Sequence, residues 1–177
     1  MKLLLLDADV IIDLLGFDLF DSLLTAYDAY VCSTVVDEVK TYKNHGITEN
    51  INFRQRYVET TKIKELSANS SEIKAMLERL PLLFSESIDP GEIESLSILI
   101  NRSDLNLKFC SCDAKAIRAL SHLRVSEKGI SLEEVLNIFK HKEVELQRRH
   151  LKSYFMENIK YGNIEYVQNV RLNKENS

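Results

Sequence analysis

Residues 2–16 read KLLLLDADVIIDLLG, and this stretch decides the fold class. Four consecutive leucines are typical of a strand that is buried on both faces of a parallel sheet. Asp9 then suits the start of a helix, because its carboxylate can accept hydrogen bonds from first-turn amides, and Gly16 suits the end. The stretch therefore predicts a strand followed at once by a helix, with Asp7 at the junction.

Short apolar runs alternate with helical patterns along the rest of the chain. Helix 90–101 has the strongest start signal, with Asp89 as N-cap, Pro90 at the first position and Glu92 at the third. Ser33 or Thr34 is expected to cap the helix after the second strand. Further strands are expected at residues 30–32, 62–66 and 107–112, and further helices at residues 19–26, 51–58, 70–80, 114–123 and 132–155. This alternation implies crossover connections, and therefore an α/β fold with a mainly parallel sheet.

The size and charge of the chain limit its architecture. A length of 177 residues with 45% hydrophobic content fits one compact domain. The net charge of −4 argues against a protein coated in basic charge, but it is uneven, at −7 over residues 1–139 and +3 over residues 140–177. A phosphate-bearing partner could use both parts, with a metal in the first and basic side chains in the second. A solvated helical tail explains the basic part equally well.

Several classes of protein are disfavoured by simple counts. Three cysteines without framework spacing are expected to be reduced thiols in an intracellular protein. Asp7, Asp9 and Asp13 interrupt the apolar start, so it does not read as a signal peptide, and no uncharged run could cross a bilayer. We therefore expect a cytoplasmic protein without a membrane partner. The histidines form no catalytic pattern and are expected at the surface: His45, His122, His141 and His150.

Acidic residues recur where predicted strands end or helices begin. They are Asp7 and Asp9, Asp37 and Glu38, Glu92 and Glu94, and Asp113. Carboxyl ends of parallel strands share one sheet edge, where such sheets bind ligands, and clustered carboxylates suit Mg²⁺ or Mn²⁺. Asp7 is the hardest to explain structurally, because a charge at the end of a buried strand needs a partner. Asp9 and Asp113 also have a structural reading as N-caps, and Glu92 as the acid of a capping box.

Helix and strand periodicity ranks the neighbouring acids. Adjacent helical residues point about 100° apart, so only one of Asp37 and Glu38 faces the sheet edge. The valine stripe of that helix favours Glu38, which leaves Asp37 outward. Ser111 leaves its strand on the same face as Asp113 and could hold a water or support a metal ligand.

Four runs together resemble the PIN-domain nucleases in order and spacing: LLLDADVIIDLL (4–15), VCSTVVDEVK (31–40), DPGEIESLSIL (89–99) and FCSCDAKAIRAL (109–120). The resemblance covers residues 1–139, with ISLEEVL (130–136) like the segment that often closes the domain. It implies a Rossmann-like α/β/α sandwich and a divalent-metal-dependent ribonuclease, often the toxin of a toxin–antitoxin pair. It also implies metal-binding and catalytic roles for Asp7, Glu38, Glu92 and Asp113, with auxiliary roles for Asp9, Glu94 and Ser111.

The chain also departs from the family pattern. Asp9 stands where many members carry asparagine, which adds negative charge. Cys112 and Ala114 flank Asp113 where some members have another acid, and Ile117 stands where this GExE variant often has arginine. Residues 140–177 have no family counterpart and are expected to be a helical extension that ends in a disordered tail from Asn173.

The sequence therefore predicts an endoribonuclease whose acids hold Mg²⁺ or Mn²⁺, with RNA as substrate and an antitoxin and a homodimer as candidate partners. Charge suggests five backbone contacts for the RNA: Lys115, Arg118, Arg148, Arg149 and Lys152. The alternative is an inactive PIN-like module that binds RNA or a protein without cutting. A phosphatase would fit the D-x-D pattern of residues 7–9, but no later lysine motif completes it.

Overall fold

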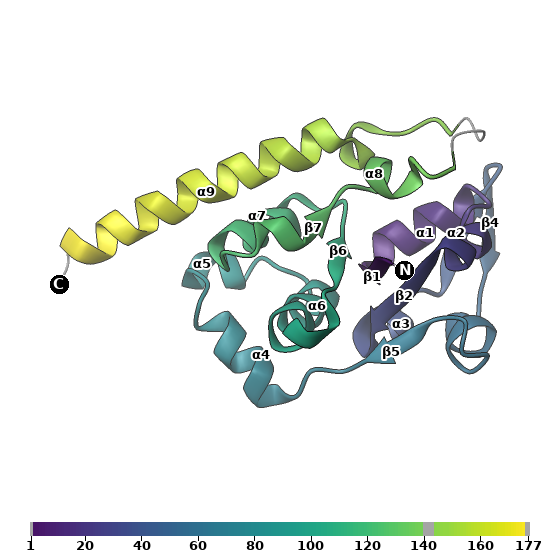
Figure 1. The fold of residues 1–177 in the computed structure, drawn as a ribbon, viewed down its shortest axis with the longest axis horizontal. Helices are drawn as coiled ribbons and strands as arrows, with labels where there is room; N and C mark the ends of the chain where they lie inside the picture. Colours follow the sequence, from purple (N-terminus) through teal and green to yellow (C-terminus); the bar gives the residue numbers. More distant parts are fainter. Residues whose placement is uncertain (1, 140–143, 176–177) are drawn as a thin grey trace.

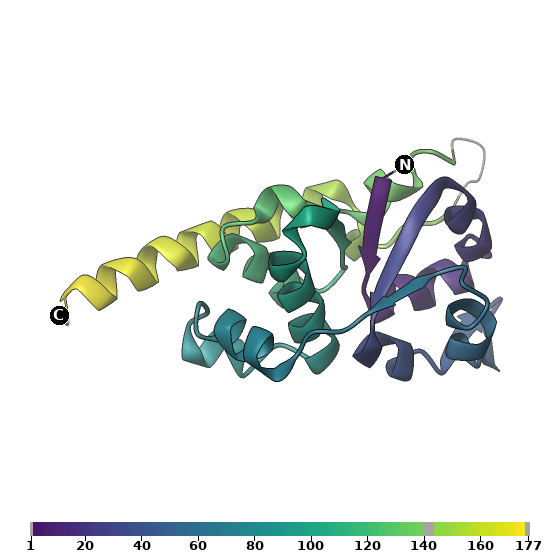
Figure 2. The same ribbon diagram turned by 60° about the horizontal axis from the view of Figure 1, so that its bottom comes forward.

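A five-stranded parallel sheet forms the centre of the computed structural model, which describes residues 2–139 and 144–175 (Figure 1). The strand order is β5-β2-β1-β6-β7, with β1 in the middle. The strands are β1 (Lys2–Leu6), β2 (Tyr27–Cys32), β5 (Lys64–Leu66), β6 (Lys108–Cys110) and β7 (Gly129–Ile130). Helices flank the sheet, as the turned view also shows (Figure 2). The predicted α/β class with a parallel sheet is confirmed.

The helices follow the strands in the order expected for crossover connections. They are α1 (Ala8–Gly16), α2 (Phe20–Ala26), α3 (Ser33–Glu38), α4 (Ser70–Leu77), α5 (Leu82–Ser85), α6 (Pro90–Asn101), α7 (Ala114–His122), α8 (Leu132–Leu136) and α9 (Lys152–Glu175). Short turns of helix lie at η1 (Arg54–Val58), η2 (Ser103–Leu105), η3 (Ser126–Lys128) and η4 (Arg148–His150). No helix among these described segments is long and apolar enough to cross a membrane.

The central strand is buried as its sequence predicts. Leu4, Leu5 and Leu6 are fully buried, and β1 pairs with β2 on one side and with β6 on the other. Burying a leucine side chain contributes about 1.5–3 kcal/mol, so this run both fixes the strand and anchors the core.

Two predicted helix starts are wrong by one or two residues. Asp7, not Asp9, is the N-cap of α1: its backbone is extended and its carboxylate accepts a hydrogen bond of 2.8 Å from the Ala8 amide. Likewise Cys32 is the N-cap residue of α3 and makes no side-chain capping bond. Ser33 and Thr34, expected as caps, instead donate hydrogen bonds to Glu94 of α6. These shifts matter because they place Asp7 at the strand end and release two hydroxyls for a different role.

The predicted long helix over residues 132–155 is wrong. Ser131 caps the short helix α8 by accepting a hydrogen bond from the Glu134 amide. The chain then reaches η4 and breaks at Leu151, whose backbone is extended, before α9 begins at Lys152. Residues 140–143 lie outside the described residues. Helix α9 includes residues 173–175, where a disordered tail was expected, and residues 176–177 are outside the described part.

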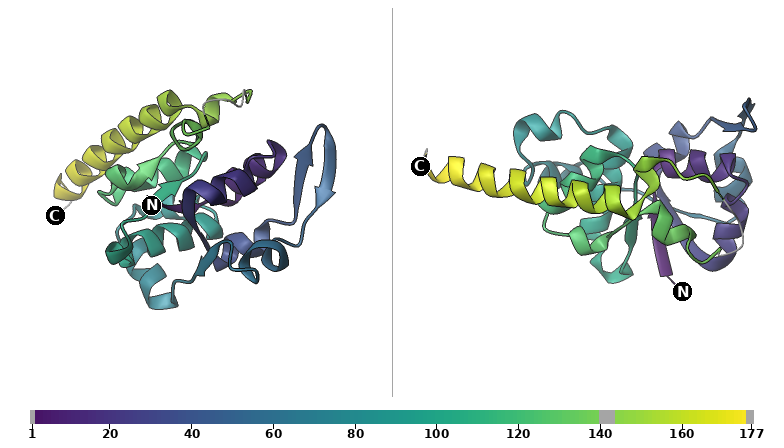
Figure 3. Two further views of the ribbon diagram at one scale, coloured as in Figure 1. Left: turned by 45° about the vertical axis from the view of Figure 1, so that its right-hand side comes forward. Right: turned by 90° about the horizontal axis from the view of Figure 1, so that it is seen from above.

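Helix α9 packs lengthwise against α7 and then projects past it (Figure 3). Gly162 permits this close approach, because a Cβ at that position would lie 2.7 Å from the carbonyl oxygen of Arg118. The C-terminal segment is therefore attached to the sheet domain along this contact rather than solvated on all sides.

A small hairpin, for which the sequence shows no clear pattern, lies beside α1. It consists of β3 (Thr41–Asn44) and β4 (Ile47–Asn50), which pair antiparallel around a two-residue loop. Both loop residues, His45 and Gly46, have positive φ angles, as a tight hairpin turn requires. The hairpin packs against α1 and so extends the wall of the domain next to the first helix.

Candidate functional site

The strand order creates a switch point between β1 and β6. From β1 the chain proceeds outward through β2 to β5, whereas β6 and β7 lie on the opposite side of β1. Ligands of open α/β sheets bind outside the carboxyl ends of the strands at such a point. Asp7 follows β1, and Ser111 and Asp113 follow β6, so the two sides of the switch point each carry predicted site residues.

Asp7 is held across this boundary by Ser111. The Ser111 hydroxyl donates a hydrogen bond of 2.7 Å to Asp7 Oδ2, while the Asp7 amide donates to the Cys110 carbonyl at 3.2 Å. Asp7 is only 5% exposed. Burial raises the pKa of its carboxyl to about 6 against the lowering effect of the hydrogen bonds from Ser111 and from the Ala8 amide, and the negative charges of Asp9 and Asp113 raise it further.

Asp113 is fixed at the start of α7. Its Oδ1 accepts hydrogen bonds from the amides of Lys115 and Ala116, at 2.6 and 3.1 Å. Its own amide donates to the Ser111 hydroxyl at 3.1 Å, so one serine connects both aspartates. Within the described residues Asp113 Oδ2 receives no hydrogen bond, which leaves that oxygen available to a ligand. The N-cap role and a ligand role are therefore compatible, because they use different oxygens.

Glu92 is buried in the first turn of α6. It is 6% exposed, and its Oε2 accepts a hydrogen bond of 3.2 Å from the Asp89 amide, as a capping acid does. Burial, followed by the negative charges of Asp7 and Asp113, raises the pKa of Glu92 to about 8. No described lysine or arginine forms an ion pair with it. A carboxylate that is buried among others without a cationic partner fits a bound cation, since the cation would compensate the charge.

Asp7, Glu92 and Asp113 form a group of acids that is called the acidic edge below. Glu38, the last residue of α3, is exposed and lies at its rim. Its carboxylate is directly against Gly91, where an added Cβ would lie 2.9 Å from Glu38 Oε2. Partial burial raises the pKa of Glu38, and the charges of Asp89 and Asp9 add to this effect. The four predicted acids Asp7, Glu38, Glu92 and Asp113 are thus brought to one edge from three separate helices and a strand end.

Asp9 is occupied by a basic side chain from the C-terminal segment. Arg149 Nη1 donates to Asp9 Oδ2 at 3.0 Å, and its Nη2 donates to both oxygens of Asp13 at 2.9 and 2.8 Å. The contact spans 140 residues of sequence. Asp9 therefore shares its charge with Arg149 rather than standing with Asp7 alone.

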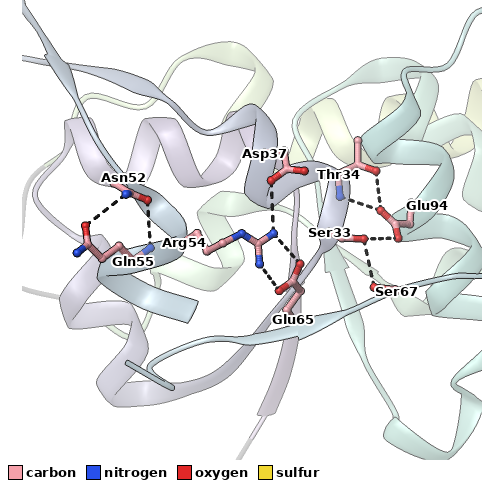
Figure 4. A network of polar contacts seen from close by, with 9 residues as sticks. All are labelled: Ser33, Thr34, Asp37, Asn52, Arg54, Gln55, Glu65, Ser67 and Glu94. Carbon is pink, nitrogen blue, oxygen red and sulfur yellow. Dashed lines mark hydrogen bonds and ion pairs between the residues drawn. The ribbon is translucent and has the colours of Figure 1, made fainter. Parts of the chain in front are cut away.

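Glu94 connects α6 with the start of α3 and with Ala68 through four hydrogen bonds (Figure 4). Its Oε2 accepts from the amide and the hydroxyl of Thr34, at 2.9 and 2.6 Å, and its Oε1 from the Ser33 hydroxyl at 2.8 Å and the Ala68 amide at 3.2 Å. Burial would raise the pKa of Glu94, but these hydrogen bonds outweigh burial and lower it. The carboxylate thereby joins α6 to the start of α3.

A second network lies beside the first in the same view (Figure 4). Arg54 donates to both oxygens of Glu65 on the edge strand, at 2.7 and 2.9 Å, and to Asp37 at 3.4 Å. Asp37 is exposed and points to this arginine, in agreement with its expected outward position. It is therefore separate from the acidic edge that Glu38 joins.

The basic residues predicted to contact RNA all have intramolecular partners. Lys115 donates to the Ser87 carbonyl, Arg118 to Asn158 and Glu165, Arg148 to Glu157, Arg149 to Asp9 and Asp13, and Lys152 pairs with Glu134. Arg118, Arg148 and Lys152 therefore belong to contacts of the C-terminal segment. Lys115 and Arg149 are the two that lie next to residues of the acidic edge.

The four predicted acids do not form a compact group of metal ligands. Within the described residues one group of at least three histidine, cysteine, aspartate or glutamate ligands has its ligand atoms all within 4.8 Å, namely Asp13, Cys112 and His150. The four predicted acids are not part of such a group. A looser arrangement still suits Mg²⁺, which keeps several waters and needs one or two protein carboxylates.

The compact group of Asp13, Cys112 and His150 is better explained as a hydrogen-bonded contact between α1 and the C-terminal segment than as a metal centre. This contact, of Asp13 with Arg149 and His150, is called the polar lock below. The Gln147 amide donates to His150 Nδ1 at 3.1 Å, so the proton must sit on Nε2, which donates to Asp13 Oδ2 at 2.9 Å. A metal on Nε2 would force a proton onto Nδ1, facing the Gln147 N–H. The expectation that histidines lie at the surface is wrong for His150 and His122, which are 0% and 4% exposed.

Sequence reasoning missed the residues that attach the C-terminal segment to α1. Arg149 was identified from its charge alone, and the partnership of Asp13 with His150 was not found. These residues are more than 130 positions apart, and no local pattern connects them. The sequence gives no signal for this contact, because His150 stands in a charged stretch that is typical of a surface helix.

Comparison of the chain with family models, curated proteins and solved structures finds no significant match in any of the three.

Proposed function

We propose that this protein is a metal-dependent endoribonuclease of the PIN type, in which Asp7, Glu92 and Asp113 hold Mg²⁺ or Mn²⁺ with Glu38 at the rim. The observation that carries the proposal is the hydrogen bond from Ser111 to Asp7 across the switch point, with Glu92 buried beside them without a cationic partner. An acidic site at that position, on a parallel sheet, suits hydrolysis of a phosphodiester. The match of four ordered runs to the PIN pattern supports the same reading.

The residues of the chain have separable tasks in this proposal. Ser111 orients the Asp7 carboxylate, and the amides of α7 hold Oδ1 of Asp113, which leaves Oδ2 for the ion. Glu94 holds α6 against α3 and thereby fixes Glu92. The bound ion would supply Lewis-acid stabilisation of the phosphate and a lower pKa for an attacking water. Lys115 supplies positive charge next to the acids for the RNA backbone, whereas the charge of Arg149 is shared with Asp9 and Asp13.

The biological setting follows from the same resemblance. PIN-type ribonucleases are often toxins, so we propose that the activity is controlled by a protein antitoxin. The part of α9 that projects beyond the sheet domain offers a surface for such control (Figure 3).

A second candidate function is an RNA- or protein-binding module that does not cut. One observation favours it: the four acids are not drawn within 4.8 Å of one another, as a preformed cage would be. The pairing of Asp9 with Arg149 also removes one auxiliary acid from the site. This candidate predicts normal folding and RNA binding with no metal-dependent cleavage.

Cleavage of single-stranded and structured RNA with Mn²⁺ separates the two candidates. Wild-type protein is compared with Asp7→Asn and Asp113→Asn, and with Asp104→Asn as a matched control, because Asp104 is exposed on η2. The nuclease proposal predicts cleavage by wild type and the control, and a loss of at least about a hundredfold in both site variants. Cleavage that survives both substitutions would refute the site, and absence of cleavage with every metal would support the binding module.

A further inference from the structure

A cavity of 460 Å³ lies beside the acidic edge, between the end of α1, the β3–β4 hairpin and the segment before η4. Its volume is within the range of roughly 300–1,000 Å³ that is usual for small-ligand sites. The hairpin is fastened there closely, since a Cβ on Gly16 would lie 2.5 Å from the carbonyl oxygen of Lys43. Three segments that are distant in sequence thus line one cavity.

Arg149 connects this cavity to the proposed active site. Its side chain lines the cavity, and its Nη1 donates to Asp9, which is two residues beyond Asp7. Asp13, one helical turn further along α1, also lines the cavity. Because a helix rises 1.5 Å per residue, the cavity begins about 7.5–9 Å from Asp7 along the helix axis, at Ile12 and Asp13.

The walls of the cavity combine flat aromatic surface with hydrogen-bonding groups. Phe17 and Tyr42 contribute rings, and Gln147 contributes a side-chain amide that also faces the His150 backbone amide in the capping box of η4. The negative charge of Asp13 is compensated by Arg149, which donates to both of its oxygens. Arg149 Nε is buried without a hydrogen-bond partner in the described structure, so one donor of this guanidinium has an unmet partner.

We propose that this cavity binds one unpaired nucleobase of the RNA substrate, next to the phosphate that lies at the acidic edge. The inference rests on the proposed function and specifies where its substrate lies. Stacking of a base on an aromatic side chain contributes about 1–3 kcal/mol, and amide or guanidinium groups read its polar edge. A paired base cannot enter, because its faces and edge are already engaged. The site therefore selects single-stranded over duplex RNA, and Tyr42 and Gln147 are specificity residues.

Binding of a short labelled RNA of mixed sequence tests the proposal. Fluorescence anisotropy is measured on the full chain carrying Asp113→Asn, so that cleavage does not interfere, with single-stranded and duplex probes. Added to this background are Tyr42→Ala, Tyr42→Phe, Gln147→Ala and the remote control Tyr161→Ala on the exposed side of α9. Thermal unfolding checks each variant. If Tyr42→Ala does not fold, Gln147→Ala decides the outcome.

The expected result is about tenfold weaker binding of the single-stranded probe by Tyr42→Ala, since one stacked base is lost. Gln147→Ala weakens it several-fold. Tyr42→Phe and Tyr161→Ala bind like the background protein, because the first retains the ring and loses only the contact of the hydroxyl with Glu49. The proposal would be overturned if Tyr42→Ala and Gln147→Ala both bound the single-stranded probe as tightly as the Asp113→Asn background protein. It would also be overturned if the background protein bound duplex and single-stranded RNA with the same affinity.

This test is independent of the nuclease assignment. Loss of binding in Tyr42→Ala together with absence of cleavage by wild type would retain the base site and reject the nuclease. Cleavage by wild type with unchanged binding in both cavity variants would retain the nuclease and reject the base site.

Discussion

The hydroxyl of Ser111 donates a 2.7 Å hydrogen bond to Asp7 Oδ2 and accepts one from the amide of Asp113. One small side chain therefore positions two acids that come from different strands. Such supporting hydrogen bonds typically change metal affinity or activity by 10- to 100-fold when they are removed.

Ser111→Ala is expected to lower the cleavage rate by about tenfold and to move the acidic limb of its pH profile upward. Removal of the donor raises the pKa of Asp7 above its present value of about 6, so a higher pH is needed to ionise it. Rates across pH measure both effects. Ser121→Ala is the matched control, because Ser121 is a buried serine that donates to the Ile159 carbonyl, away from the acids. An unchanged profile in Ser111→Ala would refute this role.

Glu92→Gln is expected to stabilise the metal-free protein at about pH 8. The pKa of Glu92 is raised from 4.5 to about 8 in the folded state, so the folded protein holds this proton more tightly than the unfolded chain. The contribution of Glu92 to stability should therefore be full below about pH 4.5 and fall as the pH rises towards 8. Glutamine removes this decline, and a gain of ~1 kcal/mol would raise Tm by roughly 2–4 °C.

The same variant should lose its response to metal. Wild type should gain stability with Mn²⁺ at about pH 8, because the ion binds the folded state and compensates the buried charges, whereas Glu92→Gln should gain much less. Melting curves with and without Mn²⁺ measure this, with Glu127→Gln as an exposed control. A Tm that responds to Mn²⁺ equally in both variants would argue against Glu92 as a ligand.

Glu94→Ala is expected to destabilise the fold by about 1–3 kcal/mol, because it removes the acceptor of partly buried donors at Thr34, Ser33 and Ala68. The pKa of Glu94 is lowered in the folded state, so its stabilising effect is present above about pH 4.5 and is lost at more acidic pH. Urea unfolding measures the change, and Glu78→Ala, at an exposed position, is the control. A cost below that of the control would show that the four hydrogen bonds contribute little.

Asp13→Asn is expected to cost about 2 kcal/mol, since it weakens a charged hydrogen-bond network with Arg149 and His150. Unfolding free energies of this variant and of Arg148→Ala provide the comparison, because Arg148 forms an exposed ion pair with Glu157, worth less than about 1 kcal/mol. Limited proteolysis should release the C-terminal segment earlier in Asp13→Asn. Equal behaviour of the two variants would contradict the description of a polar lock.

The fold was predictable where the signals are local. Four leucines followed by an acid specify β1 and α1, and Asp89, Pro90 and Glu92 specify the start of α6, because strand burial and helix capping depend on adjacent residues. The break at Leu151 was missed, since residues 132–155 keep a helical pattern that does not reveal where the chain must turn to lay α9 against α7.

The site was predictable only in part, for a related reason. The ends of β1 and β6 could be placed at one edge from the parallel topology, which brought Asp7 and Asp113 together. The contact of Arg149 with Asp9 joins residues 140 positions apart through the packing of the C-terminal segment. No periodicity reports such a contact, and the same holds for the binding of Glu94 to Thr34.

The central claim is that acids from separate runs of the chain act as one site for a divalent ion. Titration of the metal-free protein with Mn²⁺, followed by electron paramagnetic resonance of the free ion, tests it most directly. We predict saturable binding by wild type and by Asp104→Asn, and a loss of at least about tenfold in affinity in each of Asp7→Asn, Glu92→Gln and Asp113→Asn. Undiminished Mn²⁺ binding in all three site variants would contradict the account.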